Sequence, residues 1–140
     1  MYRTLIALIA LAAGTAAVRA DVVEDARIAR DLAISSLERL DAIAKPASGP
    51  IALAEQLRLE VHVPLLSYYA AFDRYENYDR ADMLRFQSCF IVMTVEVDRF
   101  SNEVEYALKV GKPLPEMVNR QAYETAREAC NTALKAASRP

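Results

Sequence analysis

Residues 83–107, MLRFQSCFIVMTVEVDRFSNEVEYA, decide the fold class of this 140-residue chain. Large apolar side chains recur in this stretch at alternating spacings of three and four, which is the heptad pattern of a helix packed along one seam. β-Branched residues gather at 91–95, yet the heptad passes straight through them, so the pattern predicts a long helix over about Asp79–Val110. The predicted seam consists of Met83, Phe86, Phe90, Met93, Val97, Phe100, Val104 and Ala107.

Three further apolar-periodic segments, at about 22–44, 50–77 and 116–137, are separated from this helix and from one another by proline and glycine. The connections are short, so consecutive helices should be antiparallel neighbours. The sequence therefore predicts an all-α fold, an up-down four-helix bundle. In the last segment the predicted buried stripe has small side chains: Val118, Ala122, Ala126, Ala129, Ala133 and Ala136.

The stretch from Leu57 to Pro64 fits the helix pattern less well than its surroundings. Apolar and polar residues alternate there with the period of a strand, and Pro64 disfavours helical geometry at Val63. A short extended piece is one interpretation, and a kinked helix is the other. Because no partner strand is evident nearby, we expect a second helix that is kinked or broken near Val63–Pro64.

The N-terminal residues 1–20 have the composition of a secretory signal peptide. One basic residue precedes an apolar run at 5–18, and small residues occupy the −3 and −1 positions, Val18 and Ala20. A membrane anchor would need about 20 apolar residues, and this run is shorter. We therefore expect cleavage after residue 20 and a single helical domain at 21–140, exported to a bacterial periplasm or secreted.

The two cysteines, Cys89 and Cys130, are the chain's full complement. An even number of cysteines in an exported protein indicates a disulfide. The two lie at similar distances along the chain from Gly111, so they would sit at similar heights in an antiparallel hairpin. We expect a disulfide that joins the third and fourth helices.

Sequence signatures of common chemistries are absent from the chain. Two thiols and one histidine do not make a tetrahedral metal site, and neither a nucleophile elbow nor a glycine-rich phosphate loop occurs. His62, on the polar phase of its segment, is typical of a surface position. A formal net charge of −2 with interspersed charges does not favour nucleic acid as a partner. The sequence thus predicts no catalytic residue, no cofactor, no metal, and no integral membrane segment after signal cleavage.

One surface feature of the long helix departs from the usual pattern of a bundle. Its outward heptad positions, which are normally polar, hold Leu84, Ile91, Val92 and Val95 alongside the charged residues Arg85, Asp98, Arg99 and Glu105. These residues either belong to a wider buried face or form an exposed apolar patch that binds a partner. The second interpretation makes this an exported non-enzymatic protein that acts through protein–protein contact, as an adaptor, accessory protein or inhibitor, with a protein partner or with itself.

A tyrosine-rich stretch at 68–78 supports an alternative function. Tyr69 and Tyr78 lie off the apolar stripe and close to Arg74, and tyrosine and arginine are favoured in binding sites. The alternative is therefore a bundle that binds a small ligand in a pocket formed by Tyr69, Arg74 and Tyr78 at one end.

Overall fold

The computed structural model describes the backbone of residues 2–43, 49–70 and 78–139, and the side chains of residues 22–43, 49–68 and 78–139. Helical segments cover most of these residues, and the described part of the chain contains no strand. The predicted all-α class is therefore confirmed. In chain order the segments are α1 (Tyr2–Ile43), α2 (Pro50–Leu57), the π-helical turn η1 (Arg58–His62), α3 (Val63–Ala70), α4 (Arg80–Arg85), the π-helical turn η3 (Ser88–Val92), α5 (Met93–Val110) and α6 (Arg120–Ala137).

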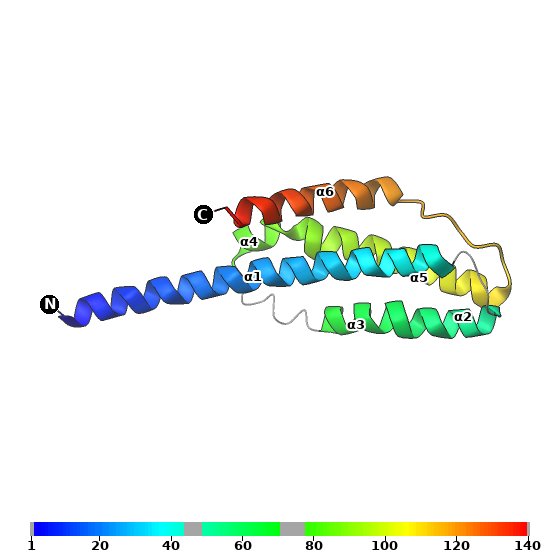
Figure 1. Ribbon diagram of the computed structural model, residues 1–140, viewed down its shortest axis with the longest axis horizontal. Helices are drawn as coiled ribbons and strands as arrows, with labels where there is room; N and C mark the ends of the chain where they lie inside the picture. The colour runs from blue at the N-terminus through cyan, green and yellow to red at the C-terminus, as the bar shows by residue number, and fades with distance from the viewer. Residues whose placement is uncertain (1, 44–48, 71–77, 140) are drawn as a thin grey trace.

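The helices α1 and α5 lie in the middle of the molecule, with α6 on one side and the run α2–η1–α3 on the other (Figure 1). The long helices alternate in direction along the molecule (Figure 1). When abutting α and π segments are joined, the described residues hold five helices. The predicted four-helix bundle is therefore not reproduced, because the expected third helix is divided in two.

The division lies at Phe86, between α4 and η3. Asp79 caps α4 by accepting a hydrogen bond from the Ala81 N–H at 3.3 Å. The helix ends at Phe86, whose φ of −107° and ψ of 12° lie outside helical geometry. The Phe86 ring nevertheless stays buried and meets the Phe90 ring edge-on, with 6.4 Å between centroids. The heptad pattern thus predicts which side chains face the core and does not reveal this local break in the backbone.

The interruption expected near Pro64 is present as a π-helical turn. The Val63 N–H donates to the Arg58 carbonyl, one residue farther back than in an α-helix. Pro64 has no N–H, and in a regular α-helix its ring would crowd the carbonyl of Glu60. A wider turn just before the proline accommodates the ring. Residues 57–64 are therefore helical and not extended.

The last helix begins at Arg120, later than the expected start near residue 116. Gly111 ends α5 in the left-handed conformation, with a φ of 67°. Pro113 and Pro115 then lack N–H groups and restrict the residues before them. The connection therefore crosses the end of the molecule without regular helix before α6 forms.

The seam predicted for 83–107 is the centre of the hydrophobic core. Phe90, Met93 and Val97 are fully buried, and all other seam residues are buried except Met83, which is half-buried. The core residues Leu57, Val61 and Leu65, from the α2–η1–α3 run, are also inaccessible.

The predicted buried stripe of the last helix was wrong at four of its six positions, whereas Ala126 is buried and Ala133 packs against the core. Val118, Ala122, Ala129 and Ala136 are exposed. Alanine is small and only weakly apolar, so its spacing carries little information about which face is buried. The residues that α6 buries are Tyr123, Ala126, Cys130 and Leu134.

Where side chains are described, the structure contains no helix with the length and apolar character needed to cross a membrane.

Candidate protein-contact surface

The residues predicted as an interface lie on α4, η3 and the start of α5. Leu84 is 57% exposed, Ile91 42% and Val95 37%. Val92 is half-buried and packs against the core. Three of the four side chains therefore present apolar surface to solvent.

The helical run on one side of α5 can be aligned with it through two contacts. The His62 Nδ1 lies 3.8 Å from the Asp98 Oδ1, and the Tyr68 hydroxyl donates to the Phe90 carbonyl at 3.5 Å. Tyr68 comes after His62 in the chain, whereas its partner Phe90 comes before Asp98, so the two runs are antiparallel. Residues that follow His62 by one turn therefore lie level with residues that precede Asp98 by one turn.

Two leucines of the neighbouring helical run are exposed as well. Leu59 and Leu66 are 53% and 60% exposed and lie one turn before and after His62, on its side of the helix. Ile91 and Val95 precede Asp98 by about two turns and one turn, and they lie on the same side of the helical run as Asp98. Leu66 and Val95 thus lie at similar heights on neighbouring helical runs. We call the exposed apolar side chains of the two runs the apolar face: Leu59, Leu66, Leu84, Ile91 and Val95.

A shallow groove lies on the other side of η3, against α6. It has a volume of about 580 Å³ and includes Val92, the partly buried member of the predicted interface. The exposed alanines of α6 explain the groove, since small side chains leave space beside the neighbouring helix. Its lining is Ser88, Val92, Val118, Asn119, Gln121, Ala122, Thr125, Ala126 and Ala129.

The exposed surface of α1 has the opposite character. The only large apolar side chain that it exposes, among the residues described, is Ile28. Polar links tie α1 to its neighbours, such as Arg39 to Glu60 at 3.2 Å and Arg30 to Asn131 at 3.2 Å. The α4–η3–α5 run exposes polar residues too, such as Arg99, Asn102 and Glu103, but it exposes more large apolar side chains than α1 does. The remaining exposed residues of α1 are Glu24, Asp31, Ser35, Glu38, Arg39, Asp41 and Ala42.

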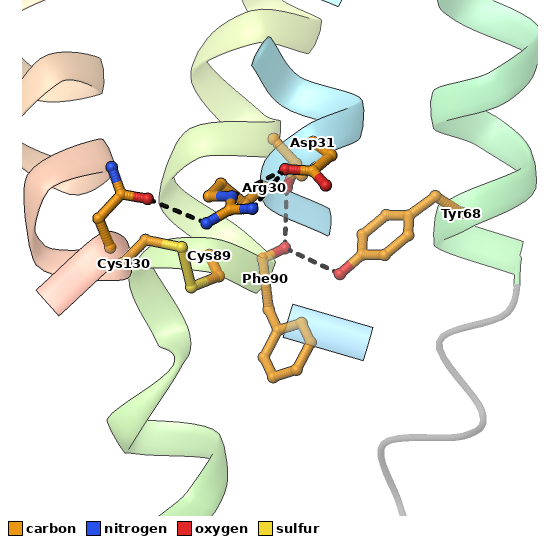
Figure 2. The surroundings of a disulfide bond; sticks show 8 residues. Arg30, Asp31, Tyr68, Cys89, Phe90 and Cys130 are labelled. Atoms are coloured by element: carbon orange, nitrogen blue, oxygen red, sulfur yellow. Dashed lines mark hydrogen bonds and ion pairs between the residues drawn. A yellow bond between two sulfur atoms is a disulfide. The ribbon is translucent and has the colours of Figure 1, made fainter. Parts of the chain in front are cut away.

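The disulfide between Cys89 and Cys130 joins η3 to α6 behind this surface, with 5.0 Å between Cα atoms. Both cysteines are inaccessible to solvent. Figure 2 shows Arg30 of α1 close to the Cys130 side of the bond and Tyr68 of α3 pointing toward Phe90. The predicted disulfide is therefore present, and segments of four helical runs meet around it.

His62 is not at the surface, which corrects the sequence-based expectation. It is 8% exposed, and its Nε2 lies 2.6 Å from the Glu105 Oε2. Asp98 approaches the other ring nitrogen, and the Ser101 hydroxyl lies 3.4 Å from both. The π-helical turn before Pro64 shifts the phase of the helix, so an alternating pattern could not indicate this position.

The carboxylate of Glu105 is held by charged neighbours. The Lys109 ammonium donates a hydrogen bond to it and is the main cause of a lowered Glu105 pKa. His62 also lowers this pKa, whereas burial opposes the shift. Glu105 thus links η1 to the last turns of α5.

Glu105→Gln is expected to lower the free energy of unfolding by about 1–2 kcal/mol at pH 7. Because the pKa is lower in the folded state, this stabilisation is complete above the ordinary value of 4.5. It is lost as the pH falls through the folded pKa. The difference between wild type and variant in urea unfolding should therefore shrink from pH 7 to pH 3.5. Glu103→Gln, at an exposed position of the same helix, is the control, and an equal Glu105→Gln deficit at both pH values would contradict the assignment.

The His62 cluster does not form a reactive centre of a known type. Ser101 beside a histidine and two carboxylates resembles a nucleophile with its base, but Ser101 is inaccessible to solvent. A substrate carbonyl has no approach to its hydroxyl oxygen. Asp98 and Glu105 approach opposite ring nitrogens of His62, and among the residues whose side chains are described no group of histidine, cysteine and carboxylate side chains is arranged to hold a metal ion.

The predicted tyrosine pocket is described only in part. The Tyr69 side chain and Arg74 lie outside the described residues. Tyr78 is half-buried and its hydroxyl donates to the Asp25 carboxylate of α1. A cavity of about 710 Å³ does lie beside the first described turns of α1, but its lining includes Glu24, Arg27, Arg85 and Phe86 and not Tyr78.

Comparison of the chain with protein-family models, with curated proteins and with solved structures finds no match.

Proposed function

We propose that this chain is an exported, non-enzymatic helical protein that acts through protein–protein contact, and that the apolar face is its contact surface. The observation that carries the proposal is the exposure of Leu84, Ile91 and Val95 along the α4–η3–α5 run. Exposed apolar patches are typical of interaction sites.

The contrast between the two central helices supports this assignment. The accessible residues of α1 are mostly charged or polar, and they are linked to η1 and α6 by ion pairs and hydrogen bonds. The α4–η3–α5 run exposes polar residues too, among them Arg99, Asn102 and Glu103. In addition, and unlike α1, it leaves several large apolar side chains accessible, among them Leu84, Ile91 and Val95.

Export is supported by the composition of residues 1–20 and by the disulfide. A buried Cys89–Cys130 bond is compatible with an oxidising compartment such as the periplasm or the extracellular medium. In such a compartment the protein would meet exported or envelope partners.

Ile91→Asp combined with Val95→Asp should abolish complex formation while the domain stays folded. Both positions are partly solvated, so the charges remain hydrated in the monomer but would be buried without partners in a complex. We expect the dissociation constant, measured by sedimentation or by titration with the purified partner, to rise at least tenfold.

The matched control is Ile28→Asp, which places the same charge at a 50% exposed isoleucine on the polar surface of α1. Circular dichroism and melting curves should be alike for both variants. The proposal is wrong if the folded double variant forms the same complexes with unchanged affinity, or if the control weakens them equally.

A further inference from the structure

A second cavity lies away from the apolar face, at the end of the molecule where α5 stops and α6 starts. It has a volume of about 500 Å³. Side chains of α1, α5, α6 and the connection from α5 to α6 form its wall: Leu40, Asp41, Phe100, Val104, Leu114, Pro115, Glu116, Met117 and Arg120.

The cavity follows from the proline-containing connection. Pro113 and Pro115 keep residues 112–119 out of a regular helix, and α6 begins only at Arg120. The chain therefore crosses the end of the core in an irregular path and packs only two apolar side chains against it, Leu114 and Met117. Space remains between this path and the last core layer.

The floor of the cavity is apolar and rigidly packed. Leu40, Phe100, Val104 and Met117 are each at least nine-tenths buried and belong to the hydrophobic core. Its volume lies within the range of about 300–1,000 Å³ that small-molecule sites occupy. Such a floor favours the apolar part of a ligand.

The rim carries more negative than positive charge. The Arg120 Nη2 donates to the Asp41 Oδ1 at 2.9 Å, so this guanidinium already has a carboxylate partner. Glu116 also lines the cavity, and the described residues provide it with no ion-pair partner. The nearest lysine in the chain, Lys112, lies over the Tyr106 ring, 5.4 Å from its centroid. The Glu116 carboxylate is therefore open to a cation.

We infer that this cavity binds a small cationic amphiphile, whose apolar group lies on Leu40, Phe100 and Met117 and whose ammonium group pairs with Glu116. A carboxylate ligand would instead meet Glu116 and would have to displace Asp41 from Arg120. The site is separate from the apolar face, so either assignment can fail without the other.

The test is titration of the ¹⁵N-labelled full domain with hexylamine, followed by amide chemical shifts, with hexanoate as the probe of opposite charge. We expect saturable shifts at Leu40, Phe100 and Met117 with hexylamine and at least fivefold weaker binding of hexanoate. Glu116→Gln should weaken hexylamine binding about fivefold, as an exposed ion pair allows. Glu128→Gln, at an exposed position outside the cavity on α6, should leave the affinity unchanged.

Three results would overturn the inference. The first is hexylamine that gives no saturable shift, and the second is hexanoate that binds as well as hexylamine. The third is a set of shifts centred on Ile91 and Val95, since the amine would then be adsorbing to the apolar face. Equal effects of Glu116→Gln and Glu128→Gln would likewise exclude a specific pairing with Glu116.

Discussion

Replacing Cys89 and Cys130 together by alanine is expected to lower the free energy of unfolding by about 4 kcal/mol. The bond closes a loop with a sequence separation of 41 residues, and its main contribution is to restrict the unfolded chain. Because typical domains are stable by only about 5–15 kcal/mol, this is a large share of the total. Urea unfolding of the oxidised wild type and of the double variant measures the difference.

The position of the bond makes this loss specific to one part of the fold. It ties α6 to η3, while Arg120 ties the other end of α6 to Asp41 of α1. Wild-type protein reduced with a thiol should unfold at the same urea concentration as the double alanine variant. A loss below about 1 kcal/mol, or a reduced wild type as stable as the oxidised one, would show that the disulfide is dispensable.

Phe90→Ala should cost about 3–5 kcal/mol, whereas Ile91→Ala, one residue later, should cost about 1 kcal/mol or less. Phe90 is inaccessible, and its ring packs against Phe86 in the seam. Ile91 is 42% exposed and belongs to the apolar face. The large loss at Phe90 arises from the cavity that a deleted ring leaves in the core.

Comparing Phe90→Ala with Ile91→Ala distinguishes a side chain that stabilises the fold from one that is available to bind a partner. Thermal and urea unfolding of the two single variants give both values on the same scale. Similar losses at the two positions would mean that Ile91 is a core residue and that the apolar face has no surplus of exposed apolar area. A small loss at Ile91 means that its apolar character is not explained by folding.

The seam at 83–107 shows what periodicity can predict. Phe90, Met93 and Val97 were expected in the core from their spacing, and all are inaccessible. The large difference in hydrophobicity between these residues and their charged neighbours makes the signal strong. The cysteine pair was predictable for a related reason, since its members lie at similar heights in an antiparallel hairpin.

The predictions that failed did so for physical reasons that the spacing of apolar residues does not reveal. Three alanines of the stripe predicted for the last helix, Ala122, Ala129 and Ala136, are exposed, because alanine differs little in free energy between the buried and the exposed face. The burial of His62 depends on a π-helical turn beside Pro64 and on Glu105, which lies far away in sequence. The cavity near Glu116 depends on the late start of α6, which only the three-dimensional path of the connection reveals.

The candidate site was predictable in outline and not in extent. Leu84, Ile91 and Val95 were identified by their outward heptad positions, and they are exposed. Leu59 and Leu66 were not identified as part of the apolar face, because their position beside the α4–η3–α5 run depends on how the two antiparallel helical runs are aligned.

Site-specific photo-crosslinking in the cell shows whether the apolar face contacts another protein. A photoreactive phenylalanine analogue would replace Ile91 or Val95 in one set of variants and Ile28 on the polar surface of α1 in another. If the apolar face is the contact surface, positions 91 and 95 give a discrete crosslinked species of higher mass and position 28 gives none. Crosslinking from position 28 alone, or from none of the three positions, would contradict this assignment.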